Sequence, residues 1–363
     1  MTDLTTPVAD SLVGTDLGLT AISEVPKTDE PQKAKDFTSN QEVRWCPGCG
    51  DYAILNTMRN FLPELGVRRE NVVFISGIGC SSRFPYYMNT YGVHSIHGRG
   101  PTFATGLATA RPDLSVFLIT GDGDALSIGG NHLIHTLRRN LNVTILLFNN
   151  RIYGLTKGQY SPTSETGKIT KSTPFGSLDN PFNPVSLAIG AEATFVGRAL
   201  DSDRKGLTEV LRGAMEHRGS ALVEILQDCP VFNDGSFDLL RKDGQENRII
   251  NVEQGKPIIF GAEGEHCVIR SGHGLEVAKT ANVSTDQIVV HDATLADSSY
   301  AFALSRLSEQ DLSHFPMGIF RKVSKPTYDD QARTQLAEAR DAAPHDMAAL
   351  QALLRGKDTW TVD

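Results

Sequence analysis

Two groups of residues in this chain have the side-chain types and spacing that bind metals and charged cofactors. The first is a set of four cysteines, Cys46, Cys49, Cys80 and Cys229. The second is Gly121-Asp122-Gly123, followed after 25 residues by Asn149-Asn150. Thiolates are ligands for an iron–sulfur cluster, whereas carboxylate and amide oxygens suit Mg²⁺. The combination predicts a redox protein in which a cluster lies near a magnesium-bound diphosphate.

The Gly121-Asp122-Gly123 motif is predicted to hold the diphosphate and its metal. Its glycines let a diphosphate approach the backbone, and the amides that follow favour negative charge. Asn149-Asn150 ends the next apolar run, so its side chains are expected beside Asp122. The Asp122 carboxylate, an Asn amide oxygen and a carbonyl near Ile152 would provide three ligands for Mg²⁺. Two ordinary strand-to-helix turns are the alternative, because Gly, Asp and Asn are common in turns.

Gly77-Ile78-Gly79 follows another apolar run and could be taken for a dinucleotide-binding loop. It lacks the third glycine, and the acidic residue about 20 positions further on, that such a loop requires. The sequence therefore argues against a nicotinamide cofactor.

The cysteines have other possible uses than a cluster. Four thiolates can hold zinc, but zinc ligands more often come as two close Cys-x-x-Cys pairs, and here Cys80 and Cys229 are isolated. A thioredoxin-like Cys-x-x-Cys would leave these two unexplained. Buried, unreactive thiols are the remaining interpretation. Cys267 has no partner in this scheme and is interpreted as a core thiol.

An α/β fold with a parallel sheet is predicted to position these motifs. Apolar, strand-length runs occur at 72–76, 115–120, 143–148, 193–196 and 221–226, separated by helical patterns at 102–110, 126–140 and 203–217. Continuous apolar strands separated by helices indicate a parallel sheet that is covered on both faces. Ligands bind such sheets at the carboxyl ends of the strands, which is where each motif falls.

The 363 residues exceed what one hydrophobic core usually organises. We expect a flexible N-terminal arm or partner-binding extension over 1–40, an α/β domain over 41–234, and a C-terminal extension over 235–363 that ends in solvated helices near 330–354. The stretch 159–184 is rich in Ser, Thr, Gly and Pro with little periodicity. It is predicted to be either a lid over the site or a surface excursion.

Composition excludes several classes of function. The formal net charge is -8, and no Lys/Arg cluster is interleaved with aromatic residues, which argues against nucleic acid as a partner. The N-terminus lacks the basic start and apolar core of a signal peptide. The longest apolar runs are far shorter than the ~18 residues of a membrane span. The expected location is the reducing cytoplasm, where five cysteines favour metal or redox chemistry.

Together these motifs resemble the β subunits of the 2-oxoacid:ferredoxin oxidoreductases, and more particularly those that act on 2-oxoglutarate. The resemblance covers roughly residues 40–234. It is carried by Trp45-Cys-Pro-Gly-Cys-Gly50, Gly77-Ile-Gly-Cys-Ser-Ser-Arg83, His97-Gly-Arg99, Gly121-Asp-Gly-Asp124 and Asn149-Asn150 running into Tyr153-Gly-Leu-Thr-Lys-Gly-Gln159. The fold that this resemblance implies is the parallel-sheet, thiamine-diphosphate-binding (PP-type) fold.

The resemblance also implies a role for each matching residue. The four cysteines would ligate a [4Fe–4S] cluster, and Asp122, Asn150 and the Ile152 carbonyl would bind Mg²⁺. The residues that would line thiamine diphosphate are Ile78, Gly79, Cys80, Ser81, His97, Gly121, Gly123, Asp124, Gly154 and Leu155.

The implied reaction is the oxidative decarboxylation of 2-oxoglutarate with coenzyme A to succinyl-coenzyme A, with ferredoxin reduced through the cluster. The glutamate that activates the cofactor would belong to a partner α subunit, so an α2β2 assembly is expected. Arg83 and Lys157 lie on loops that should face the cofactor, and a buried distal carboxylate requires a cation. Coenzyme A phosphates are a rival target for either side chain.

Other functions remain open at this point. The same reaction on pyruvate or a branched 2-oxoacid differs only in the substrate pocket. A non-catalytic electron-transfer or assembly subunit would hold a cluster without thiamine diphosphate. A non-oxidative thiamine decarboxylase or synthase gives no reason for the four cysteines.

Overall fold

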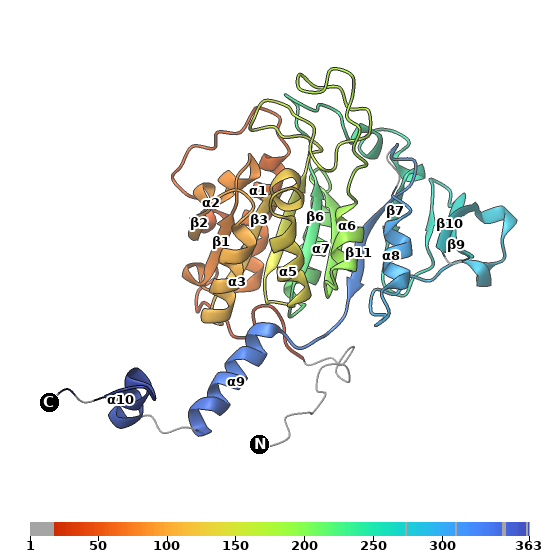
Figure 1. Ribbon diagram of the computed structural model, residues 1–363. Helices are drawn as coiled ribbons and strands as arrows, with labels where there is room; N and C mark the ends of the chain where they lie inside the picture. Colours follow the sequence, from red (N-terminus) through yellow and green to blue (C-terminus); the bar gives the residue numbers. More distant parts are fainter. Residues whose placement is uncertain (1–17, 273, 309–310, 343–345, 361, 363) are drawn as a thin grey trace.

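The fold is built on a central sheet whose strands are mostly parallel (Figure 1). The computed structural model describes residues 18–272, 274–308, 311–342, 346–360 and 362. In these ranges the sheet has eight strands in the order β2-β1-β3-β4-β6-β5-β11-β7. The strands are β1 (Val72–Ser76), β2 (Tyr91–His94), β3 (Ser115–Gly121), β4 (Thr144–Asn149), β5 (Phe195–Leu200), β6 (Ala221–Leu226), β7 (Ile249–Val252) and β11 (Phe315–Lys322). Only β11 and β5 pair antiparallel among these neighbours.

Helices cover both faces of this sheet (Figure 1). The α-helices of the described residues are α1 (Asp51–Phe61), α2 (Phe84–Tyr87), α3 (Gly100–Ala110), α4 (Asp122–Leu126), α5 (Gly130–Arg138), α6 (Pro184–Gly190), α7 (Arg204–Met215), α8 (Ser299–Ser305), α9 (Tyr328–Ala342) and α10 (Met347–Arg355). Short 3₁₀ helices are Ala34–Phe37, Leu62–Leu65, Arg69–Asn71, Ser81–Arg83, Asp238–Leu240, Gln245–Asn247, Thr280–Asn282 and Thr285–Gln287.

The strands bury both faces, as their continuous apolar runs predict. In β1, Val73 and Ile75 pack with α3, α5, α6 and α8 on one face. Val72 and Phe74 pack with α1, α2 and α7 on the other face. Because successive side chains of a strand point to opposite faces, one five-residue run contributes to both hydrophobic cores. The prediction of a parallel sheet covered on both faces is confirmed.

Two elements differ from the sequence predictions by more than two residues. The helix predicted over 126–140 is wrong at its start, because α4 ends at Leu126 and α5 begins only at Gly130. Between them the chain turns against Gly98: a Cβ placed on Gly98 would lie 2.7 Å from the Gly129 nitrogen. The strand predicted over 193–196 runs instead over 195–200, because its pairing with β6 extends to Leu200 despite the charged Arg198.

The region after residue 234 joins the central sheet through β7 and β11. It also forms a second, three-stranded sheet in the order β10-β9-β8, from Gly274–Lys279, His266–Ser271 and Ile259–Phe260. The helices predicted near 330–354 are confirmed as α9 and α10. Figure 1 shows α10 apart from the sheet, and none of its residues is buried.

Part of the arm predicted over 1–40 lies outside the described residues, which begin at residue 18. Residues 18–40 pack against the α/β core, where Val25 and Phe37 are buried. The Asn142 side chain donates to the Ala21 carbonyl at 2.9 Å. No helix in the part of the chain that the structure describes is long and apolar enough to cross a membrane.

The four strands β1, β3, β4 and β6 run parallel and end at the same edge of the sheet. The segment 77–80 follows β1, residues 122–124 follow β3, and Asn150 follows β4. Cys229 lies three residues after the end of β6. The sheet therefore brings the diphosphate motif and two of the four cysteines to one edge.

Candidate cofactor and cluster site

Asp122 is the centre of a buried group of hydroxyls at the end of β3. Its Oδ2 accepts hydrogen bonds from Ser161 Oγ at 2.5 Å and from Thr163 Oγ1 at 2.6 Å. Burial raises the pKa of Asp122 to about 6, although both hydroxyls stabilise its charged form. The raised pKa means that the protein does not fully compensate the negative charge of this buried carboxylate. A bound cation would compensate it. The structure thus buries a carboxylate at the position where the sequence predicts a metal ligand.

The segment 159–184 divides into two parts, so both predicted interpretations describe a piece of it. Ser161, Thr163 and Ser164 are buried, and they cover the Asp122 carboxylate as a lid would. Further along, Phe175 and Leu178 are almost fully exposed, at 100% and 93%. The first part covers Asp122, and the second part is a surface excursion.

The two asparagines after β4 have different surroundings. Asn149 is buried; its Oδ1 accepts from Thr163 Oγ1 at 2.8 Å and its Nδ2 donates to Glu224 Oε1 at 2.7 Å. Asn150 Oδ1 accepts only from the Ile152 backbone N–H, at 3.2 Å, among the bonds of the described chain. An amide oxygen has two lone pairs, so Asn150 retains acceptor capacity for a metal. Asn149 serves to hold the loop.

An ion pair lies behind Asn149, inside the sheet. Arg198 Nε donates to Glu224 Oε2 at 2.6 Å, and each side chain is only 1% exposed. The pair joins the neighbouring strands β5 and β6 at matched register. Arg198 also stacks on the Phe315 ring, 4.4 Å from its centroid. Glu224 therefore anchors Asn149 to a rigid part of the sheet.

Breaking this pair on one side should be costly. We expect Glu224→Gln to lower the free energy of unfolding by about 3–5 kcal/mol, because it leaves the Arg198 charge buried without compensation. Denaturant titration of the purified chain measures the change. The control is Glu209→Gln, which removes an exposed ion pair with Lys205 at 3.9 Å and should cost less than about 1 kcal/mol. Equal stability of the two variants would contradict the account.

Asp124 connects the loops on the other side of the motif. Its Oδ1 accepts from the Ile78 N–H at 3.1 Å, from the Gly98 N–H at 2.8 Å and from His97 Nδ1 at 2.6 Å. Its Oδ2 accepts from Thr120 Oγ1 at 2.9 Å. Both oxygens of this fully buried side chain are thus engaged by protein donors. Asp124 holds the loops after β1 and β2 at the edge of the sheet.

His97 is oriented by this carboxylate. With Nδ1 directed at Asp124, the second ring nitrogen, Nε2, is the one that remains for a ligand. The His97 side chain is 41% exposed, whereas the Asp124 side chain is fully buried. A carboxylate that fixes an imidazole in one orientation is a common arrangement behind functional histidines.

The segment after Asn150 folds back against the diphosphate motif. The Tyr153 hydroxyl donates to the Gly123 carbonyl at 3.1 Å. A Cβ on Gly123 would lie 2.1 Å from the Tyr153 ring, so the close approach requires glycine. Leu155 and Lys157 follow on an exposed turn, and Lys157 has the uncommon positive φ of 78°. Lys157 therefore reaches solvent beside the motif.

The chain segments that carry the cysteines are tied together by hydrogen bonds. Trp45 Nε1 donates to the Cys80 carbonyl at 2.7 Å. The Gly50 N–H donates to the Asp228 carbonyl at 3.1 Å. All four cysteines are free thiols: Cys229 is buried, Cys46 is exposed and the other two are intermediate. The structure thus gathers residues that are up to 183 positions apart (from 46 to 229).

The thiols are close enough to influence one another's ionisation. Burial, together with the charges of Asp51, Cys229 and Cys46, raises the pKa of Cys80 to about 12. Burial also raises the pKa of Cys49, with Cys229 and Cys80 among the contributing charges. Such shifts are the opposite of those that activate a thioredoxin-like cysteine.

The donor set fits an iron–sulfur cluster. A Cβ placed on Gly154 would lie 3.6 Å from Cys80 Sγ and 3.7 Å from Cys229 Sγ, so both sulfurs face this backbone. No group of three or more His, Cys, Asp or Glu side chains within the described ranges already has the geometry of a metal site. Four gathered thiols are nevertheless the ligand type and number that such a cluster uses.

Arg83 lies beside this group of thiols. Its Nη1 donates to the Arg44 carbonyl at 3.3 Å, and its charge is among those that lower the pKa of Cys80. Arg83 is partly buried, whereas Lys157 is exposed. Cys267, interpreted as a core thiol, is fully buried in β9.

Sequence reasoning did not identify Ser161, Thr163 or the Arg198–Glu224 pair. A signal for the pair exists, because β5 and β6 each carry one charged residue within an otherwise apolar run. Opposite charges at such positions indicate a buried ion pair between neighbouring strands. The two hydroxyls lie in a Ser/Thr-rich loop that offers no comparable signal.

Comparison with known proteins identifies the family of this chain. Residues 77–225 match the family described as "Thiamine pyrophosphate enzyme, C-terminal TPP binding domain". The chain is 74% identical over 364 residues to "2-oxoglutarate oxidoreductase subunit KorB" of Mycobacterium tuberculosis, covering 99% of this chain and 98% of that protein. It is 49% identical over 190 residues to "2-oxoacid:ferredoxin oxidoreductase 1, subunit beta" of Aeropyrum pernix, which is 52% of this chain and 60% of that one.

A solved structure is also similar over most of the chain. It is the "2-oxoglutarate:ferredoxin oxidoreductase from Magnetococcus marinus with 2-oxoglutarate, coenzyme A and succinyl-CoA bound", with a TM-score of 0.72 and 36% identity. The match covers 91% of this chain and 99% of that chain. The near-complete likeness to the mycobacterial protein extends beyond the residues that carry the motifs. This chain belongs to the thiamine-diphosphate-dependent 2-oxoacid:ferredoxin oxidoreductase β-subunit family.

Proposed function

We propose that this chain is the β subunit of a 2-oxoglutarate:ferredoxin oxidoreductase. With its α partner it converts 2-oxoglutarate and coenzyme A to succinyl-coenzyme A and CO₂, and the two electrons released reduce ferredoxin. The observation that carries the proposal is the meeting of the Asp122 motif with Cys80 and Cys229 at one edge of the sheet. The segment that carries Cys46 and Cys49 is hydrogen-bonded to the chain around these two cysteines. Likeness to two proteins whose names include 2-oxoglutarate supports the choice of substrate.

Asp122, Asn150 and the Ile152 carbonyl are assigned to Mg²⁺, whose charge would offset that of the diphosphate. Asp122 is supported by its burial and raised pKa, and Asn150 by the remaining acceptor capacity of its amide oxygen. When bound, thiamine diphosphate supplies the electron sink that lets a 2-oxoacid lose CO₂. Ser161 and Thr163 hold the Asp122 carboxylate in place and keep water from it.

The cofactor is proposed to lie along the ends of β1, β3 and β4. Its lining is assigned to Ile78, Gly79, Cys80, Ser81, His97, Gly121, Gly123, Gly154 and Leu155. Asp124, also predicted as a cofactor contact, is better assigned as a positioning residue, because its oxygens are engaged by Ile78, Gly98, His97 and Thr120. His97 Nε2 is then available to bind the cofactor or exchange a proton with it.

Electrons would leave through a [4Fe–4S] cluster held by Cys46, Cys49, Cys80 and Cys229. The Cys80 sulfur lies beside Gly154, and Gly154 is also assigned to the cofactor lining. The cluster and the cofactor would therefore both lie against the Gly154 backbone, and this short separation would favour rapid electron transfer between them. The exposed Cys46 marks the side from which ferredoxin could approach.

Arg83 and Lys157 are assigned to the distal carboxylate of 2-oxoglutarate. We expect Lys157→Ala to lower kcat/KM for 2-oxoglutarate relative to pyruvate by about tenfold to hundredfold, because hydrogen bonds to charged groups contribute about 1.5–3 kcal/mol. Arg83→Ala should act in the same direction. Steady-state rates on both substrates measure the ratio, with Lys171→Ala, another exposed lysine, as the control. An equal loss on both substrates would remove these residues from the substrate pocket.

The α partner is assigned the glutamate that activates the cofactor, and two α and two β chains form the proposed assembly. The function is tested by purifying the complex without oxygen, assaying iron, sulfide, magnesium and thiamine diphosphate, and identifying the acyl product by mass spectrometry. Succinyl-coenzyme A from a complex that holds all four components is the expected result. A complex with a cluster but no thiamine diphosphate would point instead to an electron-transfer subunit.

A further inference from the structure

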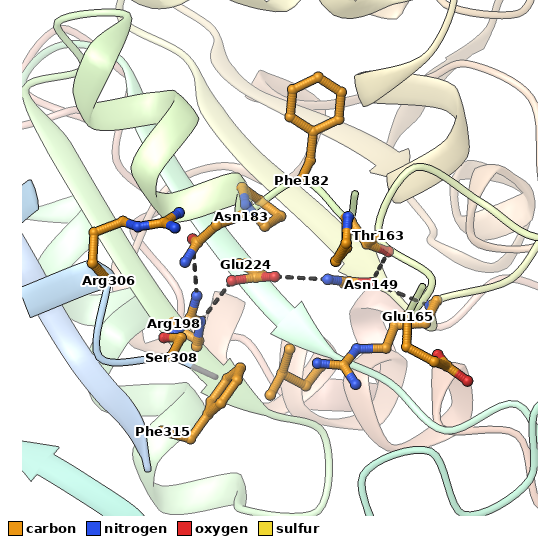
Figure 2. Close-up of a pocket in the computed structure, with 14 residues that line it drawn as sticks. Asn149, Thr163, Glu165, Phe182, Asn183, Arg198, Glu224, Arg306, Ser308 and Phe315 are labelled. Atoms are coloured by element: carbon orange, nitrogen blue, oxygen red, sulfur yellow. Dashed lines mark hydrogen bonds and ion pairs between the residues drawn. The ribbon is translucent and has the colours of Figure 1, made fainter. Parts of the chain in front are cut away.

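A small cavity lies beside the cofactor edge, beyond Asn149 (Figure 2). Its volume is about 110 Å³. Figure 2 shows Arg306, Asn183 and Ser308 on one side of it, and Thr163 with Asn149 on the other. A cavity of this volume has room for several water molecules. It is well below the 300–1,000 Å³ typical of sites for larger ligands, so an occupant would be small.

The charged groups that line this cavity leave an excess of positive charge. Its carboxylates are Glu224 and Glu165. Glu224 is neutralised by Arg198 at 2.6 Å, and Glu165 pairs with Lys168 at 2.8 Å. Two further arginines, Arg151 and Arg306, line the cavity without a carboxylate of their own in the described ranges.

Arg151 is the more buried of these two. Among the described residues its guanidinium makes no hydrogen bond or ion pair; its contact is the Phe237 ring, 4.9 Å from the centroid. The charges of Glu165 and Glu224 act on Arg151, but in the described ranges both carboxylates form their ion pairs with other residues. Its backbone has the uncommon positive φ of 55°. A partly buried guanidinium without an acceptor has strong unused hydrogen-bonding capacity.

Other donors face the same space. Ser308 Oγ accepts from Arg198 Nη1 at 2.6 Å, and its hydroxyl donates to no acceptor among the described residues, so it can donate to a ligand. Arg306, at the end of α8, is exposed and also makes no side-chain hydrogen bond in the described part of the chain. Arg198, by contrast, already donates to Glu224, to Ser308 and to the Pro316 carbonyl.

We propose that this cavity is a binding site for a small oxyanion, a carboxylate or a phosphate, held by Arg151 and Arg306. A guanidinium presents parallel N–H donors that match the paired oxygens of both groups. This anion site is distinct from the diphosphate site, because Thr163 lies between the two. The Thr163 hydroxyl is hydrogen-bonded to Asp122 and to Asn149. A bound anion would therefore sit one side chain away from the proposed metal ligand. The inference does not depend on the proposed reaction.

The test uses the complex with its α partner, saturated with thiamine diphosphate and Mg²⁺ so that the diphosphate site is filled. Inorganic phosphate and succinate are titrated separately by isothermal calorimetry. We expect saturable binding of at least one, with Kd raised about tenfold or more in Arg151→Gln and severalfold in Arg306→Gln. The control is Arg138→Gln, which removes the same charge from an exposed residue of α5 outside the cavity. The anion that binds more tightly identifies the class.

Two outcomes would overturn the proposal. One is the absence of saturable binding of either anion to the loaded complex. The other is anion binding outside the cavity. It would be shown if both cavity variants bound the anion as tightly as Arg138→Gln, or if Lys157→Ala abolished binding, because the anion would then lie in the substrate pocket. Because Arg306 is exposed, its variant should fold even if Arg151→Gln does not, and thermal unfolding of each variant checks this.

Discussion

Cys80→Ala is expected to abolish the cluster while leaving thiamine diphosphate bound. The substitution removes one of four proposed iron ligands and leaves the backbone after β1, which the cofactor would contact, in place. Changes in the surroundings of a metal ligand already cost 10–100-fold in affinity or activity. We therefore expect iron and sulfide near zero, and dye-linked 2-oxoacid oxidation reduced by about 100-fold or more. Iron analysis and electron paramagnetic resonance measure the cluster.

The matched control for this experiment is Cys267→Ala. Cys267 is fully buried in β9, within the three-stranded sheet and away from the edge where the motifs lie. This variant should keep its iron and its activity. If Cys267→Ala lost the cluster and Cys80→Ala retained it, the ligand assignment would be wrong.

Asp122→Ala should have the reverse effect, with cofactor lost and cluster kept. The variant removes a buried carboxylate that is proposed to bind Mg²⁺. It also removes the acceptor to which the Ser161 and Thr163 hydroxyls donate. Both consequences weaken the site, so the affinity for thiamine diphosphate should fall by about 100-fold or more. Equilibrium dialysis of the complex with Mg²⁺ and the cofactor measures the change.

The control here is Asp341→Ala, which removes an exposed carboxylate from α9. It should bind the cofactor as tightly as the unaltered protein. Retention of full cofactor affinity by Asp122→Ala would contradict the metal assignment. The two alanine variants, Cys80 and Asp122, therefore separate the cluster from the cofactor within the same chain.

The parallel strands of this fold are readable from the sequence because each is a short apolar run that is buried on both faces. The runs 72–76 and 221–226 coincide with β1 and β6, and the turns that follow them carry the motifs. The apolar-run pattern does not predict the edge strand β2, because all four of its residues are exposed and they form no apolar run. The break between α4 and α5 depends on the packing of Gly98 against Gly129, which local pattern does not reveal.

The sequence predicts a metal ligand at Asp122 because Mg²⁺ prefers carboxylate oxygens, but it does not predict the contacts that tertiary packing creates around the motif. Asp124 illustrates the difference. Its place in the motif suggests a cofactor contact, whereas the folded chain surrounds it with donors from three separate segments. Thr163 is a second example, because it reaches Asp122 from 41 residues further along the chain. No spacing rule in the sequence connects them.

The central claim is that this chain and its α partner oxidise 2-oxoglutarate through a cluster held by this chain. The most direct test is viologen reduction by the anaerobically purified complex, with coenzyme A and either 2-oxoglutarate or pyruvate. The account predicts rapid, coenzyme A-dependent reduction with 2-oxoglutarate and a rate at least about tenfold lower with pyruvate, the least that a hydrogen bond to a charged group would give. Failure to reduce the dye with any 2-oxoacid, in a complex that holds both cofactor and cluster, would contradict it.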